Sequence, residues 1–230
     1  MTTAVILGVG GLGCPAALAL AEEAPDVRLI LVDPDQVERS NLSRQILFTE
    51  RDVGEPKAIV AARRLAELVP GVRAEPRVVA FRRDTAAGLL AGCDVVLDGT
   101  DDFDTRFLAN DAACAGGIPL VHGAALGWRG QILTILPGRG SCLRCLFEGP
   151  PPTGAVPTCA EAGVLSPLCG LVGAAMASEA ARLLRGERAR WAGRLHQWDA
   201  LRAVDRDVSV PVSSDCPACG VAPEAALRHP

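Results

Sequence analysis

The sequence lacks the features that mark nucleic-acid-binding and exported proteins. It has no excess of basic residues, because 23 Lys and Arg stand against 27 Asp and Glu and give a net charge of −4. Nonspecific binding to nucleic acid or to an anionic membrane is therefore not expected. No Lys or Arg precedes the first apolar run, "AVIL", and glycines interrupt the apolar residues after it. We interpret this N-terminus as mature protein rather than as a signal peptide.

The sequence also lacks an uncharged apolar run of the roughly 20 residues that a membrane-spanning helix needs. The best candidate, residues 163–178, is shorter and contains Pro167, so we expect a buried core helix and no membrane association. The nine cysteines are an odd number in a chain without an export signal. They favour free thiols or a metal site in a reducing compartment, which predicts a cytoplasmic protein.

Size and composition indicate one domain. The chain has 230 residues, of which 49% are hydrophobic and 22% charged. A chain of this length can bury roughly 70% of its unfolded surface in one core. There is no evident internal repeat, and the low-complexity segment is the loop "EGPPPTGAVP" at residues 148–157.

Strand and helix patterns alternate through the first 135 residues. Strands are predicted at residues 4–8, 27–33, 71–80, 93–100 and 118–125, and helices at residues 14–23, 56–69 and 105–115. Pro76 weakens the third strand, and "GQILTILP" at residues 130–137 predicts an antiparallel extension. The order predicts an α/β fold with a doubly wound, Rossmann-like, mostly parallel sheet. Ligands bind such sheets at the carboxyl ends of the strands.

A glycine motif follows the first strand. Gly8, Gly10 and Gly13 match G-x-G-x-x-G between a strand and a helix, where backbone N–H groups can approach phosphate. Asp33 lies 20 residues after Gly13, at the separation expected of a carboxylate bonded to a ribose hydroxyl. These residues predict a nucleotide site. A close-packed structural turn is the alternative.

The residues after Asp33 favour a nucleoside triphosphate that is attacked and loses pyrophosphate over a nicotinamide cofactor. Arg44 and Lys57 supply two cations that a nicotinamide site does not need, whereas departing pyrophosphate requires charge compensation. In "LDGTDD", Asp98, Asp101 and Asp102 surround a strand end where a carboxylate could hold Mg²⁺. The alternatives are solvated surface cations and an acidic helix cap.

Two C-x-x-C pairs form the second signal. Cys142 and Cys145 come from "CLRC", and Cys216 and Cys219 come from "CPAC". Together they predict a closed tetrahedral site for structural Zn²⁺ that joins the C-terminal segment to the body of the domain. A redox pair or unrelated thiols are the alternatives.

These motifs together resemble the ThiF/MoeB/HesA adenylyltransferases, bacterial relatives of ubiquitin-activating enzyme. The matching segments, which extend over nearly the whole chain, are "GVGGLG", "VDPD", "SNLSRQ", "GEPKA", "LDGTDD", "GAALGWRGQI", both C-x-x-C pairs and "TCAEAGVLSP". The resemblance implies a reaction in which the C-terminal carboxylate of a small ubiquitin-like sulfur-carrier protein, ending in Gly-Gly, attacks the α-phosphorus of ATP. An acyl adenylate and pyrophosphate result.

The resemblance also implies site residues. Asp33 would bind ribose, and Asn41, Arg44 and Lys57 would contact phosphates, while Asp101 would hold Mg²⁺. The full set of implied nucleotide contacts is Gly8, Gly10, Gly11, Gly13, Asp33, Asp35, Asn41, Arg44, Gln45, Lys57, Asp101 and Asp102. The implied catalytic residues are Arg44, Lys57, Asp101 and Cys159.

By the same resemblance, residues 1–230 form a single adenylation domain. Residues 1–135 would bind the nucleotide, and residues 136–230 would bind zinc and dock the carrier. A homodimer and a sulfur donor such as a cysteine desulfurase or a rhodanese are implied as partners. Thiamin, molybdopterin and specialised-metabolite pathways are not distinguished. A peptide or a modified RNA base as the activated substrate, and a nonenzymatic or NAD-binding module, are the alternatives.

The chain departs from the family pattern at two places. Relatives carry an N-terminal helical segment with an arginine that reaches the partner subunit's ATP site, whereas the first strand here begins almost at Met1. We expect either another cation, with Arg39 as a candidate, or a truncated start with impaired activity. Asp102 stands where the family commonly has Asn, and its charge could strengthen metal binding or repel the triphosphate.

Cys159 lies between the proline-rich loop and the apolar helix. A helix N-terminus there could lower its pKa and expose a thiolate, although a small buried hydrophobe is the alternative. In relatives, a cysteine at this position bonds covalently to the carrier in some members and is dispensable in others. Cys169, inside the apolar helix, is not expected to replace it.

Overall fold

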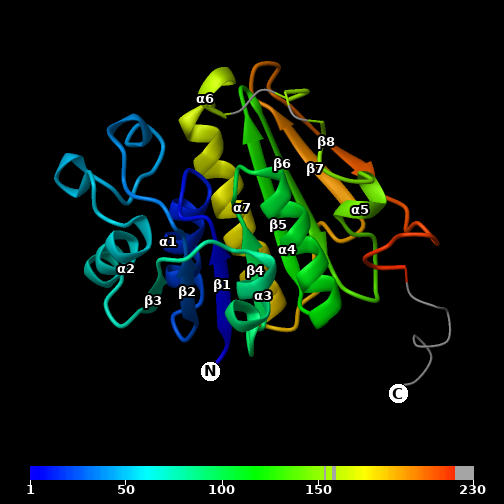
Figure 1. The fold of residues 1–230 in the computed structure, drawn as a ribbon, viewed down its shortest axis with the longest axis horizontal. Helices are drawn as coiled ribbons and strands as arrows, with labels where there is room; N and C mark the ends of the chain where they lie inside the picture. The colour runs from blue at the N-terminus through cyan, green and yellow to red at the C-terminus, as the bar shows by residue number, and fades with distance from the viewer. Residues whose placement is uncertain (153, 157–158, 221–230) are drawn as a thin grey trace.

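An eight-stranded sheet with the strand order β3-β2-β1-β4-β5-β6-β7-β8 forms the centre of the computed structural model (Figure 1). The structure describes residues 1–152, 154–156 and 159–220, without the side chains of residues 159 and 160. The strands are β1 (Thr3–Leu7), β2 (Arg28–Val32), β3 (Arg73–Arg77), β4 (Val95–Asp98), β5 (Leu120–Leu126), β6 (Arg129–Ile135), β7 (Arg194–Asp199) and β8 (Val204–Ser209).

The first five strands are parallel, as the alternating pattern predicts. β1 pairs with both β2 and β4, so the strand order reverses beside β1. β3 forms an edge of the sheet and pairs in parallel with β2. This position explains why the strand tolerates Pro76, because an edge strand does not need every N–H group. The predicted mostly parallel, Rossmann-like sheet is confirmed.

The last three strands are antiparallel. β6 pairs with β5, as the extension at residues 130–137 predicts, and β7 and β8 continue the sheet. The sequence analysis did not predict β7 or β8. β8 reads "VDRDVS" and is largely exposed, so it carries little of the apolar signal that identifies buried strands.

Helices cover both faces of the sheet. α1 (Gly13–Glu23), α2 (Lys57–Leu68) and α7 (Ser166–Leu184) pack on one face with one hydrophobic cluster. α3 (Arg83–Leu90), which the sequence analysis missed, and α4 (Phe103–Gly116) pack with a second cluster on the other face. The remaining elements are short: η1 (Arg39–Asn41), η2 (Glu50–Asp52), α5 (Leu143–Leu146) and α6 (Cys159–Ala162).

The apolar helix α7 runs further than its uncharged stretch predicts. It continues past residue 178 to Leu184 and includes Glu179, which is fully buried. The Glu179 carboxylate accepts hydrogen bonds from Thr134 Oγ1 at 2.7 Å and from the backbone N–H groups of Arg190 and Trp191. By length and composition α7 could cross a membrane, but it packs against α1, β5 and β6 as the predicted core helix.

The β1–α1 turn requires two of its glycines for different reasons. Gly8 has φ +79°, in the left-handed region that favours glycine. Gly13 begins α1, and a Cβ atom there would overlap the backbone carbonyl of Gly8. The third glycine of the motif therefore lets the first helical turn pack closely on the strand end.

We predict that Gly13→Ala destabilises the fold by about 1–3 kcal/mol or more, because the overlap with a backbone atom needs a main-chain shift. Urea unfolding measures the change. Gly88→Ala is the matched control. Gly88 lies within α3 with open space around it, so alanine there should stabilise by about 0.5–1 kcal/mol. Equal stability of the two variants would contradict the packing role of Gly13.

Candidate functional site

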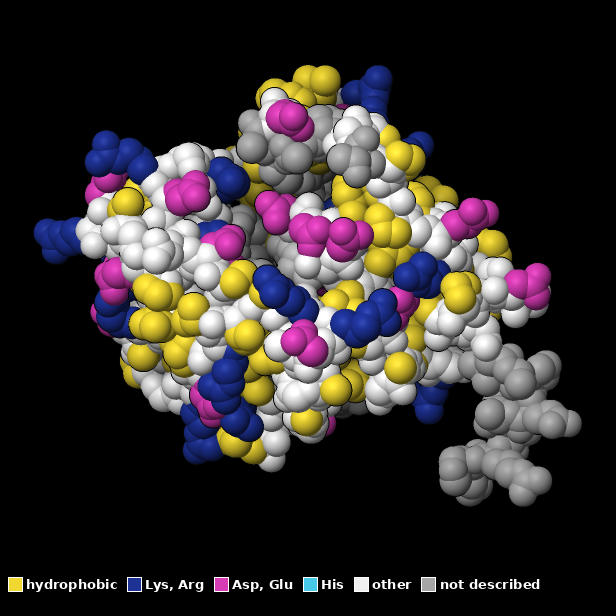
Figure 2. Space-filling view, in the orientation of Figure 1, with side chains coloured by type: hydrophobic (Ala, Val, Ile, Leu, Met, Phe, Trp, Pro, Cys, Tyr) yellow, Lys and Arg dark blue, Asp and Glu magenta, His cyan; other side chains and the backbone are white. Residues whose placement is uncertain are grey.

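A cavity of about 820 Å³ opens where β1, β2 and β4 end. Figure 2 shows a hollow on this face with acidic side chains gathered near its rim. All of the predicted nucleotide contacts except Gly13 line the cavity: Gly8, Gly10, Gly11, Asp33, Asp35, Asn41, Arg44, Gln45, Lys57, Asp101 and Asp102. The structure therefore brings together residues that lie up to about ninety positions apart in the sequence, although what each contacts in a ligand stays a prediction.

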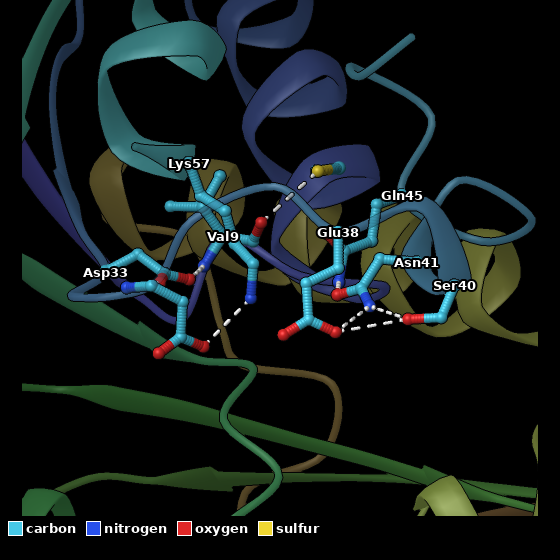
Figure 3. A network of polar contacts seen from close by, with 9 residues as sticks. Val9, Asp33, Glu38, Ser40, Asn41, Gln45 and Lys57 are labelled. Carbon is cyan, nitrogen blue, oxygen red and sulfur yellow. Dashed lines mark hydrogen bonds and ion pairs between the residues drawn. The ribbon is translucent and has the colours of Figure 1, made fainter. Parts of the chain in front are cut away.

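Asp33, at the end of β2, anchors the glycine turn. Its carboxylate accepts hydrogen bonds from the backbone N–H groups of Val9, at 2.7 Å, and Asp35, at 2.9 Å (Figure 3). Burial raises the pKa of the Asp33 carboxyl group, and the positive charge of Lys57 opposes this shift. Each carboxylate oxygen has a further lone pair, so the anchoring role leaves room for a ribose hydroxyl.

Lys57 places a buried cation at the cavity wall. It is the first residue of α2, and its Nζ lies 2.9 Å from Asp35 Oδ2. The Lys57 side chain is 8% exposed, whereas that of Asp35 is 65% exposed. Because Asp35 is largely solvated, its ion pair with Lys57 contributes little to stability. An anionic ligand in the cavity can therefore compete with Asp35 for the Lys57 ammonium group.

A chain of side-chain hydrogen bonds runs along the same wall (Figure 3). Gln45 Nε2 donates to Asn41 Oδ1 at 2.7 Å, and Asn41 Nδ2 donates to Ser40 Oγ at 2.9 Å and to Glu38 Oε2 at 3.5 Å. Gln45 Oε1 is one of two buried side-chain polar atoms without a partner among the described residues. An unsatisfied buried acceptor costs about 1–3 kcal/mol, so a donor from water or a ligand would stabilise this wall.

The cations of this region divide between the cavity and the outer surface. Arg44 lines the cavity beside Gly11, and its Nη1 donates to the Ser40 carbonyl at 3.2 Å. Arg39 is not among the lining residues. Its side chain is 79% exposed and pairs with Glu50 at 2.9 Å, so Arg39 as a substitute cation for a partner subunit's site stays a prediction. Arg82, which the sequence analysis missed, lines the cavity after β3.

A second cavity, also of about 820 Å³, adjoins the first. It lies over β5, β6 and β7, beside the described part of the loop at residues 150–156. Four residues line both cavities: Asp101, Asp102, Arg106 and Ala125. The loop after β4 therefore stands at the junction of the two cavities, an arrangement that the sequence analysis did not predict.

The three acidic residues of "LDGTDD" have three different environments. Asp98 is fully buried and bonded to His122 and Thr100, so it is not available to a metal ion. Asp102 caps α4 and accepts from the N–H groups of Asp104, at 3.1 Å, and Thr105, at 2.8 Å. Asn also caps helices well, so Asp102 supplies the capping hydrogen bonds that an Asn at this position would make.

Asp101, like Asp102, is an exposed acidic residue at the cavity junction. Mg²⁺ is commonly held by one or two carboxylates together with substrate phosphates and water. The Asp101 side chain fits this donor set, so it would hold the ion if Mg²⁺ accompanies the nucleotide.

The four predicted cysteines converge. Their Sγ atoms all lie within 4.8 Å of one another, with 3.6 Å between Cys142 and Cys216 and 3.3 Å between Cys145 and Cys219. Thiolates around a tetrahedral Zn²⁺ with bonds of 2.3 Å lie about 3.8 Å apart. The spacing and chemistry of the donors therefore fit a metal ion, with Zn²⁺ as the candidate.

Two residues of α4 support this cluster, and the sequence analysis missed both. The Cys114 thiol, followed by the other thiols of the cluster, lowers the pKa of Cys142 despite burial. Asn110 is fully buried; its Nδ2 lies 3.7 Å from Cys142 Sγ, and its Oδ1 accepts from the Leu143 N–H at 2.9 Å. A C-x-x-C pattern identifies ligands, but it does not identify the residues that orient them.

Cys159 and Cys169, the two cysteines considered for a covalent bond to the carrier, are described to different extents by the structure. Cys159 begins α6 in the backbone, but its side chain lies outside the described residues. The long apolar helix begins only at Ser166, so Cys159 does not directly precede it. Cys169 lies inside α7 as predicted; it is buried and lines the nucleotide cavity near Gly11.

Comparison with known proteins gives a consistent result. The profile of the ThiF family matches residues 1–219. The chain belongs to the ThiF family. It is 46% identical over 224 residues to a sulfur carrier protein adenylyltransferase of Thermus thermophilus, with 95% of this chain and 82% of the relative covered. It is 44% identical over 216 residues to the SAMP-activating enzyme E1 of Haloferax volcanii, with 94% and 79% covered.

A solved structure agrees on the fold. The structure of E. coli MccB with ATP superposes with a TM-score of 0.83 at 20% identity and covers 96% of this chain and 67% of that chain. At 20% sequence identity, the similarity to MccB shows a shared fold and does not show a shared substrate. The ThiF-family relatives establish the enzyme class, so the chain is an adenylyltransferase and ATP is its nucleotide. This class disfavours the NAD-binding module.

We predict that the purified ThiF-family protein holds one Zn²⁺ per chain at the four cysteines, and that Cys216→Ser loses it. Metal binding couples to folding, so chelation or the substitution should lower the thermal midpoint. Elemental analysis and thermal unfolding measure both. Cys93→Ser is the control, since Cys93 is a thiol outside the cluster. Absent stoichiometric metal, with all four thiols freely titratable, would contradict the zinc assignment.

Proposed function

We propose that this chain uses ATP to adenylylate the C-terminal carboxylate of a small ubiquitin-like sulfur-carrier protein ending in Gly-Gly, which prepares the carrier for sulfur transfer. The observation that carries the proposal is the junction at Asp101 and Asp102, where one cavity lined by the nucleotide motifs meets a second cavity. The names of the two relatives, a sulfur carrier protein adenylyltransferase and a SAMP-activating enzyme, support the choice of substrate.

In the proposed reaction, a carboxylate oxygen of the carrier attacks the α-phosphorus of ATP. A bond forms between this oxygen and phosphorus, and the α–β phosphoanhydride bond breaks. The products are the acyl adenylate and pyrophosphate, which carries away the electron pair of the broken bond. No external redox reagent or proton donor is required for this balance.

Charge repulsion is the main obstacle, because an anion approaches a polyanion. Lys57 would exchange its exposed partner Asp35 for a phosphate oxygen, and Arg44 lies at the same wall. When bound at Asp101, Mg²⁺ would neutralise further phosphate charge. The nearby backbone N–H groups of the glycine turn and the N-terminus of α1 favour an anionic group at this position.

The second cavity is the proposed path of the carrier's C-terminal tail. Ala124, Ala125 and Gly130 line it close to the junction, so small residues border the point where the tail would reach the nucleotide. A Gly-Gly end has no side chains that would obstruct this approach. Polar groups of β7 and β8, including Gln197 and Arg206, line the more distant part.

The proposed organisation is one adenylation domain over residues 1–230. In it, residues 1–135 provide the nucleotide site, and residues 136–230 hold the metal and complete the docking surface. The proposal includes a homodimer, a cysteine desulfurase or rhodanese as sulfur donor, and a location in the cytoplasm. Sedimentation would detect the dimer.

A peptide or a modified RNA base as the substrate is the alternative. The structural neighbour MccB has been solved in complex with N-formylated MccA, but its 21% identity to this chain carries the fold and not the substrate. Pyrophosphate exchange stimulated by a Gly-Gly-ended carrier, and by neither a short peptide nor RNA, would separate these substrates.

We predict that Asp101→Ala abolishes exchange of labelled pyrophosphate into ATP while the protein remains folded. The loss of a loop carboxylate usually changes stability by no more than about 0.5 kcal/mol, so a large loss of activity reflects the site. Asp26→Ala is the control, since Asp26 is an exposed acidic residue in the turn before β2. Exchange at the parental rate in Asp101→Ala would refute the Mg²⁺ assignment.

We predict that Cys159→Ala keeps pyrophosphate exchange but loses a thiol-sensitive covalent adduct with the carrier. A thiolate would attack the acyl group only after adenylation, with AMP as the leaving group, so the first step does not need it. Mass spectrometry of the mixed proteins detects the adduct, and Cys169→Ala is the control. An intact adduct in the Cys159→Ala variant assigns the role to another thiol.

A further inference from the structure

We propose that His122 is a positioning residue: through Asp98, it holds the loop of residues 99–102 at the junction of the two cavities. The expected effect on catalysis rests on the proposed function, because the loop carries Asp101. Its structural part, that His122 restrains the loop, is independent of any ligand.

Strand register brings the two side chains together. Asp98 is the last residue of β4, and it is the register partner of His122 in the parallel ladder with β5. His122 Nδ1 and Asp98 Oδ2 lie 2.8 Å apart, and the two side chains are 2% and 0% exposed. A hydrogen bond between such buried polar groups is strong, because water cannot replace either partner.

Asp98 transmits this contact to the loop. Its other oxygen, Oδ1, accepts from the backbone N–H of Thr100 at 3.1 Å and from Thr100 Oγ1 at 2.7 Å. Burial raises the pKa of the Asp98 carboxyl group, but hydrogen bonding and charge from His122, followed by the charge of Arg106, lower it below its ordinary value overall. Because a carboxylate only accepts hydrogen bonds, His122 supplies the Nδ1–H donor in this pair.

The opposite side of the loop is held by Arg106. Its Nε and Nη2 both donate to the Thr100 carbonyl, at 2.9 and 2.8 Å. The loop is thus bonded through the N–H, the hydroxyl and the carbonyl of Thr100, the residue immediately before Asp101. These bonds leave the main chain of residue 100 little freedom to rotate.

The loop also packs against the glycine turn. The Gly99 N–H donates to the Leu7 carbonyl at 3.0 Å, and a Cβ on Gly8 would lie 3.2 Å from the Gly99 carbonyl oxygen. A shift of the loop would therefore disturb both the nucleotide cavity and the position of Asp101. Since this loop lines the nucleotide cavity, loss of the His122 restraint should weaken the binding of MgATP.

Two substitutions test the inference. His122→Asn keeps an N–H donor near the position of Nδ1, whereas His122→Leu fills the space without one. In nucleotide-free and metal-free protein, amide hydrogen exchange should be at least about tenfold faster at residues 99–102 in His122→Leu, as expected for loss of a buried bond to a charged group. His122→Asn should exchange at close to the parental rate.

Kinetics give the second measurement. In pyrophosphate exchange, His122→Leu should raise the KM for MgATP at least about tenfold and reduce kcat less, and His122→Asn should restore the parental KM. If His122→Leu does not fold, Thr100→Val removes the hydroxyl donor to Asp98 and should accelerate amide exchange in the same loop.

Four outcomes are decisive. Amide exchange at the parental rate in His122→Leu would overturn the positioning role, because the His122–Asp98 hydrogen bond would then not restrain the loop. Equal acceleration in His122→Leu and His122→Asn would also overturn it, because the packing of the side chain and not its N–H donor would then hold the loop. A lower thermal midpoint with an unchanged KM would overturn its catalytic consequence. Absence of pyrophosphate exchange in the parent, with the predicted amide exchange intact, would refute the proposed function and leave the restraint of the loop supported.

Discussion

The close approach of three backbone segments at the ends of β1, β2 and β4 is the constraint on which the candidate site depends. The glycine turn contacts the β4–α4 loop directly, and Asp33 bonds the turn to the end of β2. Backbone atoms of the turn and the loop can lie this close because Gly8 and Gly99 have no side chain. Without this contact, the residues that line the cavity would come from loops with independent positions.

The cations of the site have partners in the free protein, but these partners leave the site able to bind an anion. Lys57 is buried but pairs with the exposed Asp35, and Arg44 bonds to a backbone carbonyl. Neither contact buries both partners, so an incoming polyphosphate can replace it at modest cost. By contrast, the Asp98–His122 pair is fully enclosed and serves as a fixed support.

The four-cysteine cluster joins α5 to the segment that follows β8. β8 is polar and largely exposed, whereas the segment after it places Val210, Cys216 and Cys219 in the second hydrophobic cluster. Convergence of Cys216 and Cys219 on Cys142 and Cys145 brings this segment against α4 and α5, where the four thiols could hold a metal ion. A closed set of four thiolates has no open position for substrate, so its contribution is structural.

The sequence by itself determined the parallel core, because apolar strands and amphipathic helices carry their periodicity locally. It also determined which four cysteines converge, and eleven of the twelve nucleotide contacts implied by the motifs and the family resemblance line the cavity. It did not reveal α3, β7 and β8, whose apolar signals are weak. Nor could it show that Asp98, Asp101 and Asp102 have separate environments. Pairing of Asp98 with His122 depends on strand register, and the shared wall of two cavities depends on packing between distant segments; only the tertiary structure decided these.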